Sequence, residues 1–148
     1  MPHFSETSKA RLGTCHADLR AVFHEVIRIF DCKVIYGHRT PEEQFELFKR
    51  GRRLENDIWV IENILEVVTY KDGFDDKSNH NIIPSDAGDI APYPINWKDI
   101  NRMYFFAGHV LMIAKYHGII LRWGGDWDMD TQIKDQNFND LVHFERIE

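Results

Sequence analysis

Cysteine is scarce in this chain of 148 residues, which contains only Cys15 and Cys32. Two cysteines are too few for a disulfide framework, and a reducing cytosol would keep them as thiols. We interpret both as small buried hydrophobic residues, the usual state of a free cysteine. Cysteine as a zinc ligand is a lesser alternative, because neither residue has a second cysteine close by in the sequence.

An excess of positive charge and a long apolar run are also missing. The formal net charge is −6, so the chain has no general electrostatic reason to bind nucleic acid. The longest uncharged run, residues 103–114, is too short to cross a bilayer, and we expect no membrane partner. The first residues lack an apolar segment, so we expect no signal peptide and synthesis in the cytoplasm.

The remaining composition is that of a globular protein. Hydrophobic residues make up 43% of the chain and aromatic residues 13%. A chain of this length buries enough surface to fold without a disulfide or a structural metal. We therefore expect residues 1–148 to form a single domain, without a second, separate domain, and to act as a monomer.

Apolar spacing and turn residues predict a mixture of helices and short strands. Thr40, Pro41 and Glu43 form a capping box that should begin a helix ending near Gly51. Four cations, Lys49, Arg50, Arg52 and Arg53, would follow it, either offsetting the helix dipole or contacting an anionic polymer. Other helices are predicted at 8–30, 57–65 and 97–116, and strands at 32–36, 67–70, 87–91, 119–123 and 142–146. Because the order lacks a βαβ rhythm, the expected fold class is α+β with a small antiparallel sheet flanked by helices.

Two of the eight histidines lie beside acids and turn residues at predicted strand edges. His80, Asp89 and His143 could occupy three corners of a zinc tetrahedron and leave the fourth open for water, as a catalytic zinc site requires. Asp140 lies three residues before His143, in a suitable place for a base. The other histidines are interpreted as structural or exposed.

Four segments carry a resemblance that covers nearly the whole chain. Residues 78–89 and 140–145 resemble the Ser-x-His-x6-Asp and Asp/Glu-x-x-His signatures of the zinc peptidase family that includes D-alanyl-D-alanine carboxypeptidases and L-alanyl-D-glutamate peptidases. Residues 37–44 are similar to the Gly-x-Arg-Thr-x-x-Glu-Gln segment of its phage endolysins, and residues 121–127 to their Trp-Gly-Gly-Asp-Trp segment. This resemblance implies a Hedgehog- and DD-peptidase-like fold, in which residues 1–148 form a single zinc peptidase domain without a separate cell-wall-binding domain.

The chain departs from the family pattern in one place. The usual spacing from His80 would put the acid at position 87, which is Ala87. Matching residues 87–92 to the family's Ala-x-Asp-hydrophobic-x-Pro segment places the ligand at Asp89 and gives the loop two extra residues. Asp86 is the competing ligand.

The resemblance also implies roles for the site residues. His80, Asp89 and His143 would hold zinc, which activates a water molecule, and Asp140 would be the general base and then the general acid. Since Asp140 and His143 would face opposite ways on a regular strand, a bend or bulge is expected between them. Arg39 would bind a substrate carboxylate or the developing oxyanion, with a salt bridge as its alternative role. Ser78 would bind substrate or brace the ligand loop.

Asp126, Asp128 and Asp130 alternate along a turn in the manner of a calcium loop. An EF-hand is excluded, since its twelfth position would be Asn137 and its sixth Thr131. A looser Ca²⁺ site and a solvated acidic loop both stay open. Trp123 and Trp127 are interpreted as packing or cleft-wall residues.

The resemblance implies a phage endolysin: a zinc metallopeptidase that cleaves the L-alanyl-D-glutamate bond of bacterial peptidoglycan after release through a membrane lesion, and so lyses the host. One alternative is a D-Ala-D-Ala carboxypeptidase or dipeptidase with the same zinc site. Another is a zinc-stabilised domain that binds cell wall without hydrolysis.

Overall fold

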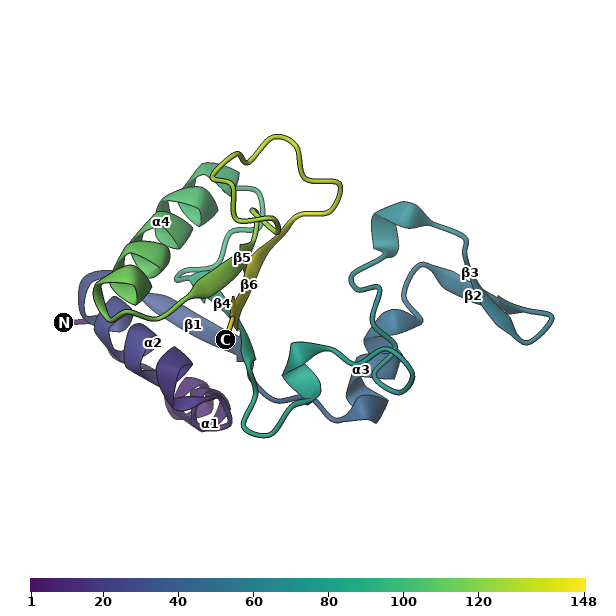
Figure 1. Ribbon diagram of the computed structural model, residues 1–148, viewed down its shortest axis with the longest axis horizontal. Coiled ribbons are helices and arrows are strands. Elements are labelled where there is room, and N and C mark those ends of the chain that lie inside the picture. Colours follow the sequence, from purple (N-terminus) through teal and green to yellow (C-terminus); the bar gives the residue numbers. More distant parts are fainter.

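A computed structural model describes residues 1–148 and divides them into a body and a projecting lobe (Figure 1). The body contains the helices α1 (Glu6–Gly13), α2 (Ala17–Ile29) and α4 (Ile100–Tyr116), and the strands β1 (Cys32–Tyr36), β4 (Ala87–Pro92), β5 (Leu121–Gly124) and β6 (Asp140–Arg146). The lobe, residues 41–77, contains α3 (Pro41–Phe48), β2 (Arg52–Glu55), β3 (Ile58–Ile61) and the short 3-10 helix η1 (Ile64–Glu66). A second 3-10 helix, η2 (Asn79–Asn81), leads from the lobe back to the body.

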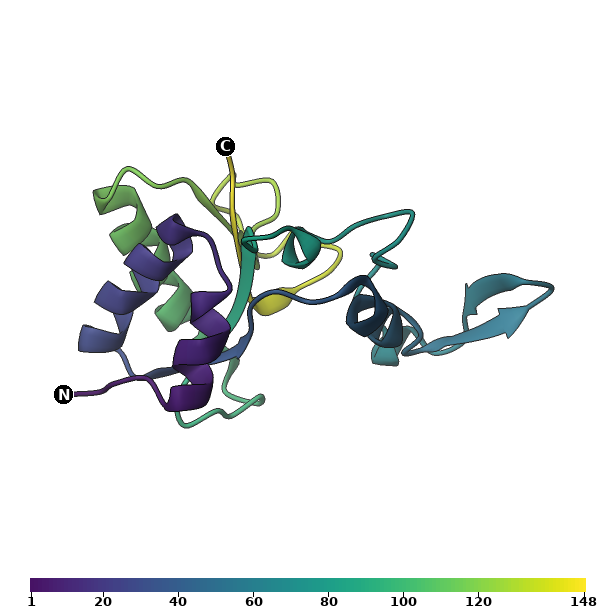
Figure 2. The same cartoon turned by 90° about the horizontal axis from the view of Figure 1, so that it is seen from below.

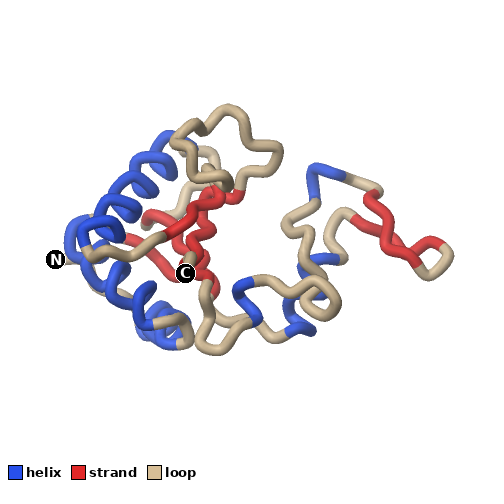
Figure 3. Tube along the Cα trace, viewed as in Figure 1, coloured by secondary structure: helices blue, strands red, loops and turns tan.

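The four strands of the body form one antiparallel sheet in the order β1-β4-β6-β5. Helices α1, α2 and α4 lie on one side of this sheet, and the lobe extends away on the other side (Figures 1 and 3). Turning the molecule by 90° shows the lobe again standing apart from the body (Figure 2). This arrangement confirms the predicted α+β class with a small antiparallel sheet.

The hydrophobic core lies between the sheet and its helices. Phe144 on β6 makes edge-to-face contacts with Phe23 of α2 and Phe106 of α4. Cys15 and Cys32 are buried free thiols, as predicted, and burial raises the pKa of the Cys15 thiol to about 11. No helix of the chain combines the length and the apolarity that a bilayer span requires.

The helix predicted over residues 8–30 is wrong, because the chain forms two helices separated by residues 14–16. The His16 imidazole caps the second helix by accepting from the Asp18 N–H, and the Ser85 backbone bonds to Thr14 and His16 at the break. Continuous apolar spacing hides this break, since the partner that stabilises it comes from a distant part of the sequence.

Two predictions in the lobe are also wrong. Residues 57–65, predicted as a helix, contribute β3 to a hairpin with β2, which is joined by Asn56 and Asp57, both at positive φ. A two-residue turn with both residues in this region is the type I′ hairpin turn. Residues 67–70, predicted as a strand, have no strand partner; there the Thr69 hydroxyl accepts a hydrogen bond from the buried Gln44 amide.

Other elements lie where they were predicted. Thr40 and Glu43 make both hydrogen bonds of the capping box, and α3 follows directly. Helix α4 begins three residues later than expected because Asp99 is its N-cap, and Gly118 follows its end at φ +69°. Ile100, the first residue of this helix, is exposed, although the helical spacing of the apolar residues over 97–116 predicts that it faces inward.

Candidate metal centre and active site

Three side chains that are distant in the sequence meet at the face of the sheet opposite the helices. His80 comes from η2, while Asp89 and His143 are directly paired neighbours on β4 and β6. The Nε2 atom of His80 and the Nδ1 atom of His143 each lie 3.2 Å from Oδ1 of Asp89, and 3.3 Å from each other. All three side chains are buried.

This triangle has the dimensions of one face of a zinc tetrahedron. Bonds of about 2.0 Å in tetrahedral geometry separate neighbouring ligand atoms by about 3.3 Å. The outer nitrogens are also occupied: Nδ1 of His80 donates to the Gly37 carbonyl at 2.7 Å, and Nε2 of His143 donates to Glu145 at 3.1 Å. Each imidazole therefore presents its other nitrogen to the centre, as metal-binding histidines do. The donor set fits a metal ion such as zinc, with the fourth position left for a water or substrate oxygen.

The electrostatics of the three groups favour a cation. Burial opposes ionisation of Asp89, but His80, His143 and Arg39 hold its pKa well below the usual range. Burial lowers the pKa of His80. Burial also disfavours the charged form of His143, yet its hydrogen bonds to Asp89 and Glu145 outweigh that effect and raise its pKa to about 10. The lowered pKa of Asp89 and the raised pKa of His143 therefore both indicate that the pocket stabilises positive charge at its centre.

Asp86, the competing ligand, lies outside the triangle. Its carboxylate accepts from Nε of Arg146 at 3.1 Å, and its N–H donates to the Asn79 carbonyl. The two additional residues of the loop thus place Asp89, and not Asp86, beside the histidines.

Asp140 begins β6 and lines the same cleft as the triangle. Trp123 pairs with Phe144 but the next residue, Gly124, pairs with Asp140, so β6 bulges between Asp140 and His143 as expected. A Cβ at Gly124 would meet the Asp140 carbonyl oxygen, which explains the glycine. Burial, reinforced by the charge of Asp89, raises the pKa of Asp140 to about 6. A carboxyl group with such a pKa can both accept and donate a proton near neutral pH.

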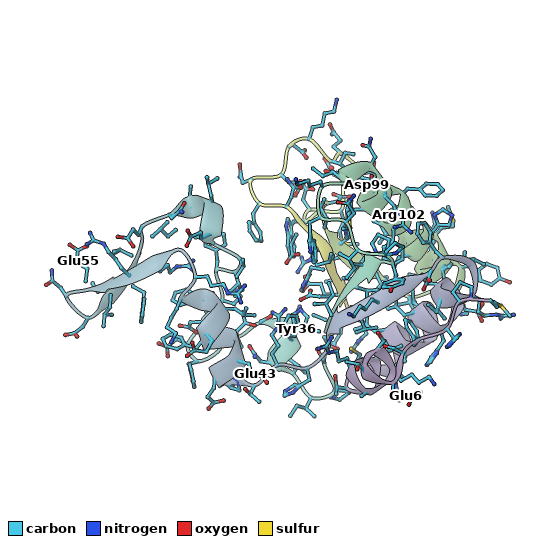
Figure 4. The ribbon with its side chains drawn as sticks, turned by 180° about the vertical axis from the view of Figure 1, so that it is seen from behind. Glu6, Tyr36, Glu43, Glu55, Asp99 and Arg102 are labelled. Atoms are coloured by element: carbon cyan, nitrogen blue, oxygen red, sulfur yellow. The ribbon has the colours of Figure 1, made fainter.

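The guanidinium of Arg39 is already engaged by the chain. One terminal nitrogen binds Oδ2 of Asp89, the other donates to Gln44 at 3.2 Å, and the group stacks on Tyr36. Tyr36 lies where β1 leaves the sheet for the lobe (Figure 4). The Nε–H of Arg39 is buried without a partner and is the donor left over for a ligand.

Ser78 is the N-cap of η2. Its hydroxyl accepts from the His80 N–H at 3.2 Å, and its own N–H donates to Asn81 at 2.8 Å. These bonds brace the short helix that carries His80, which is one of the two roles considered for Ser78.

Glu145 is the important site residue that was not identified from the sequence. Its carboxylate accepts hydrogen bonds from His143, from Nε of Arg122 at 2.6 Å and from Asn79 at 2.7 Å, and these contacts lower its pKa to about 2 against the effect of burial. The sequence could have indicated this role, because Glu145 lies two positions after His143 on a predicted strand and residues two apart on a strand share a face. Trp127 packs its ring against His143, whereas Trp123 is buried in the core.

The triangle lies in a cleft of about 810 Å³ between the body and the lobe. The body contributes the ligand residues, Asp140 and Trp127, and the lobe contributes residues 67–71 and the end of α3. Tyr70 of the lobe and Phe138 of the body make an edge-to-face contact across it. The cleft is large enough for several residues of a peptide.

Ligand atoms of Asp126, Asp128 and Asp130 lie within 4.8 Å of one another. However, the Asp126 carboxylate already accepts hydrogen bonds from the N–H groups of Asp130 and Thr131 at 3.2 and 3.0 Å. These contacts describe a self-bonded acidic turn, and the calcium alternative finds no support in the structure.

Comparisons with known proteins agree with this geometry. The family model of phage L-alanyl-D-glutamate peptidases matches residues 1–147. An L-alanyl-D-glutamate peptidase of Escherichia phage T5 is 25% identical over 138 residues, which cover 90% of this chain and 87% of that protein. The crystal structure of the Serratia marcescens L-Ala D-Glu endopeptidase ChiX has a similar fold, with a TM-score of 0.65, 22% identity, and coverage of 99% of this chain and 91% of that one.

Proposed function

The chain belongs to the family of phage L-alanyl-D-glutamate peptidases, and we propose that it hydrolyses this bond in peptidoglycan stem peptides with a zinc ion held by His80, Asp89 and His143. The observation that carries the proposal is the triangle of ligand atoms 3.2–3.3 Å apart at a cleft that also contains Asp140. The body and the lobe act together as one peptidase domain, since the cleft needs both.

When bound, zinc would supply the positive charge that lowers the pKa of a water molecule in the site to about 7. Glu145 keeps His143 oriented for this role, because its carboxylate fixes the outer nitrogen of the imidazole. Gly37 does the same for His80 through its carbonyl. Asp89 offers one oxygen to the centre while Arg39 holds the other.

Asp140 takes the proton of the attacking water and passes it to the leaving amine of D-glutamate. Burial raises its pKa above that of an ordinary carboxyl group, which suits a group that must accept a proton and then return it. A zinc-stabilised domain that only bound cell wall would have no use for such a base, so this residue favours hydrolysis.

Arg39 and Ser78 have supporting roles. The unpartnered Nε–H of Arg39 is the donor available to the scissile carbonyl oxygen as negative charge develops on it. Ser78 holds η2, and through it His80, in place. The substrate partner is the bacterial cell wall, which the protein would reach, as a monomer, through a lesion in the host membrane.

The test is digestion of purified peptidoglycan by zinc-loaded protein, with and without a chelator, followed by mass analysis and end-group assay. New L-alanine C-termini and D-glutamate N-termini should appear and should vanish on chelation. Asp140→Asn should slow their release by about 10²- to 10⁴-fold while zinc remains bound. Asp135→Asn, in an exposed loop outside the cleft, is the matched control and should keep full activity.

Two results would contradict the proposal. Release of D-alanine in place of the new internal ends would make the protein a carboxypeptidase with the same site. Tight zinc binding without any cleavage would make it a binding domain and would leave Asp140 without a function.

A further inference from the structure

The four cations that follow α3 differ in what they contact. Lys49 and Arg53 pair with glutamates of the lobe, and Arg52 donates to backbone carbonyl oxygens, one of them at the end of α3. Arg50 has no carboxylate or carbonyl partner for its side chain, is exposed, and lines the cleft. Stabilisation of the helix end therefore accounts for Arg52 but leaves Arg50 unexplained.

The other cations of the cleft also fall into two groups, those that pair with a carboxylate and those that do not. Arg39, Lys71 and Arg122 each pair with a carboxylate of the chain. Lys77, which precedes the helix carrying His80, lines the cleft without such a partner. Arg50 and Lys77 are thus two positive charges without a carboxylate partner at this cleft, in a chain whose net charge is −6. Such a local reversal of sign attracts an anionic ligand.

The substrate carries its fixed anions on one side of the scissile bond. In peptidoglycan, D-glutamate is joined onward through its side-chain carboxyl group, so its α-carboxylate is free. A third residue such as diaminopimelate adds another carboxylate. The L-alanine side is joined as an amide to the glycan and has no such charge. Cations in the cleft can therefore distinguish the two directions in which a stem peptide could lie.

We propose that Arg50 and Lys77 bind the carboxylates on the D-glutamate side of the stem peptide and so fix its direction in the cleft. This inference rests on the proposed function, since it names the groups of that substrate which the cleft recognises. A carboxylate remote from the reacting carbonyl carries the same charge in the ground state and in the transition state. Its recognition should therefore lower KM and leave kcat nearly unchanged.

The experiment compares Arg50→Gln and Lys77→Gln with two matched controls of the same charge change, Arg53→Gln in the lobe and Lys134→Gln in the body, neither of which lines the cleft. The substrates are L-Ala-γ-D-Glu-diaminopimelate peptides with an N-acyl L-alanine, either unmodified, amidated at the glutamate α-carboxylate, or amidated at the diaminopimelate carboxylates. Each cleft variant should raise KM about fivefold for the unmodified peptide, as expected for an exposed ion pair, with kcat unchanged. That effect should disappear with the peptide whose recognised carboxylate is amidated, which identifies the carboxylate.

Binding of the same peptides is measured in the Asp140→Asn background, so that recognition is observed separately from cleavage. Weaker binding by the cleft variants, confined to peptides with the free carboxylate, supports the proposal even if no cleavage is found, and in that case only the proposed function fails. The proposal is overturned if the cleft variants match the controls, or if they weaken binding of all three peptides equally.

Discussion

The body and the lobe use their apolar residues in opposite ways. In the body, side chains of α2, α4 and β6 are buried against one another, with Phe23, Phe106 and Phe144 fully enclosed. In the lobe, the hairpin and the segment after it expose Leu54, Ile58, Ile61, Ile64 and Leu65. The ligand residues and Asp140 belong to the body or its edge, whereas the lobe supplies a wall of the cleft. The positions of the catalytic groups therefore depend on the part of the chain that is best packed.

The largest effect on stability should come from the body. Phe144→Ala removes a fully buried ring that contacts two other rings, and should lower the free energy of unfolding by about 3–5 kcal/mol. Phe45→Ala, its counterpart in the lobe, removes a partly buried ring and should cost about 1–2 kcal/mol. Urea unfolding of the two variants measures both values. Equal losses would mean that the lobe is as tightly packed as the body.

The next effect concerns the support of the metal ligands by the body. Glu145→Gln keeps the size of the side chain but removes the charge that orients His143, and should weaken zinc binding by about 10- to 100-fold. Competition with a chromophoric chelator gives the affinity. Glu62→Gln on the lobe is the control and should leave it unchanged. An unaltered affinity in Glu145→Gln would show that the sheet alone holds the imidazole in place.

The pH dependence of kcat/KM should distinguish Asp140, the base on the body, from the cations on the lobe. Because the pKa of Asp140 is raised to about 6 without metal, its carboxyl signal in the chelated protein should titrate near that pH, and zinc should lower the midpoint. The base must be ionised, so kcat/KM should fall about tenfold for each pH unit below the midpoint of the loaded enzyme. NMR titration and rate profiles at monitored zinc occupancy test both statements. Arg50→Gln should leave the profile unmoved, and a midpoint near the ordinary value of 3.8 in chelated protein would contradict the burial of Asp140.

The smallest effect should come from the tip of the lobe. Ile58→Ala truncates a side chain that is 65% exposed, so the free energy of unfolding should change by less than about 0.5 kcal/mol. Glu55 in the adjoining β2 marks how far the hairpin lies from the body (Figure 4). A larger loss of unfolding free energy, measured with urea, would show that the hairpin packs against a surface outside this single chain.

The sequence was most informative where the cause of the structure is local. The capping box at Thr40 specifies the start of α3 with residues three positions apart, and the alternation of residues 32–36 specifies strand β1. The sequence did not predict the break between α1 and α2. The backbone of Ser85, about 70 positions further along the chain, stabilises this break through hydrogen bonds. The hairpin was missed although Asn56 and Asp57 are residues that tolerate positive φ.

The same distinction holds for the site. The resemblance of residues 78–92 and 140–145 to family segments identified His80, Asp89 and His143 as ligand candidates, and the need for a bulge followed from the two-residue period of a strand. The contacts around them were not predictable. That Arg39 would give one terminal nitrogen to Asp89 and the other to Gln44, leaving only Nε–H free, depends on how β1, α3 and β4 meet in space.

The hairpin closes on itself at its base. The carbonyl oxygen of Gly51 accepts hydrogen bonds from the N–H groups of both Glu62 and Asn63, so the chain leaves and returns at nearly the same point. Strands β2 and β3 therefore form a segment whose two ends lie next to each other. Replacing it by an insert of another length would change the entropic cost of closing the loop only slightly. A protein engineer could exchange residues 52–61 for a wall-targeting peptide and retain the sheet, the ligand triangle and Asp140 without alteration.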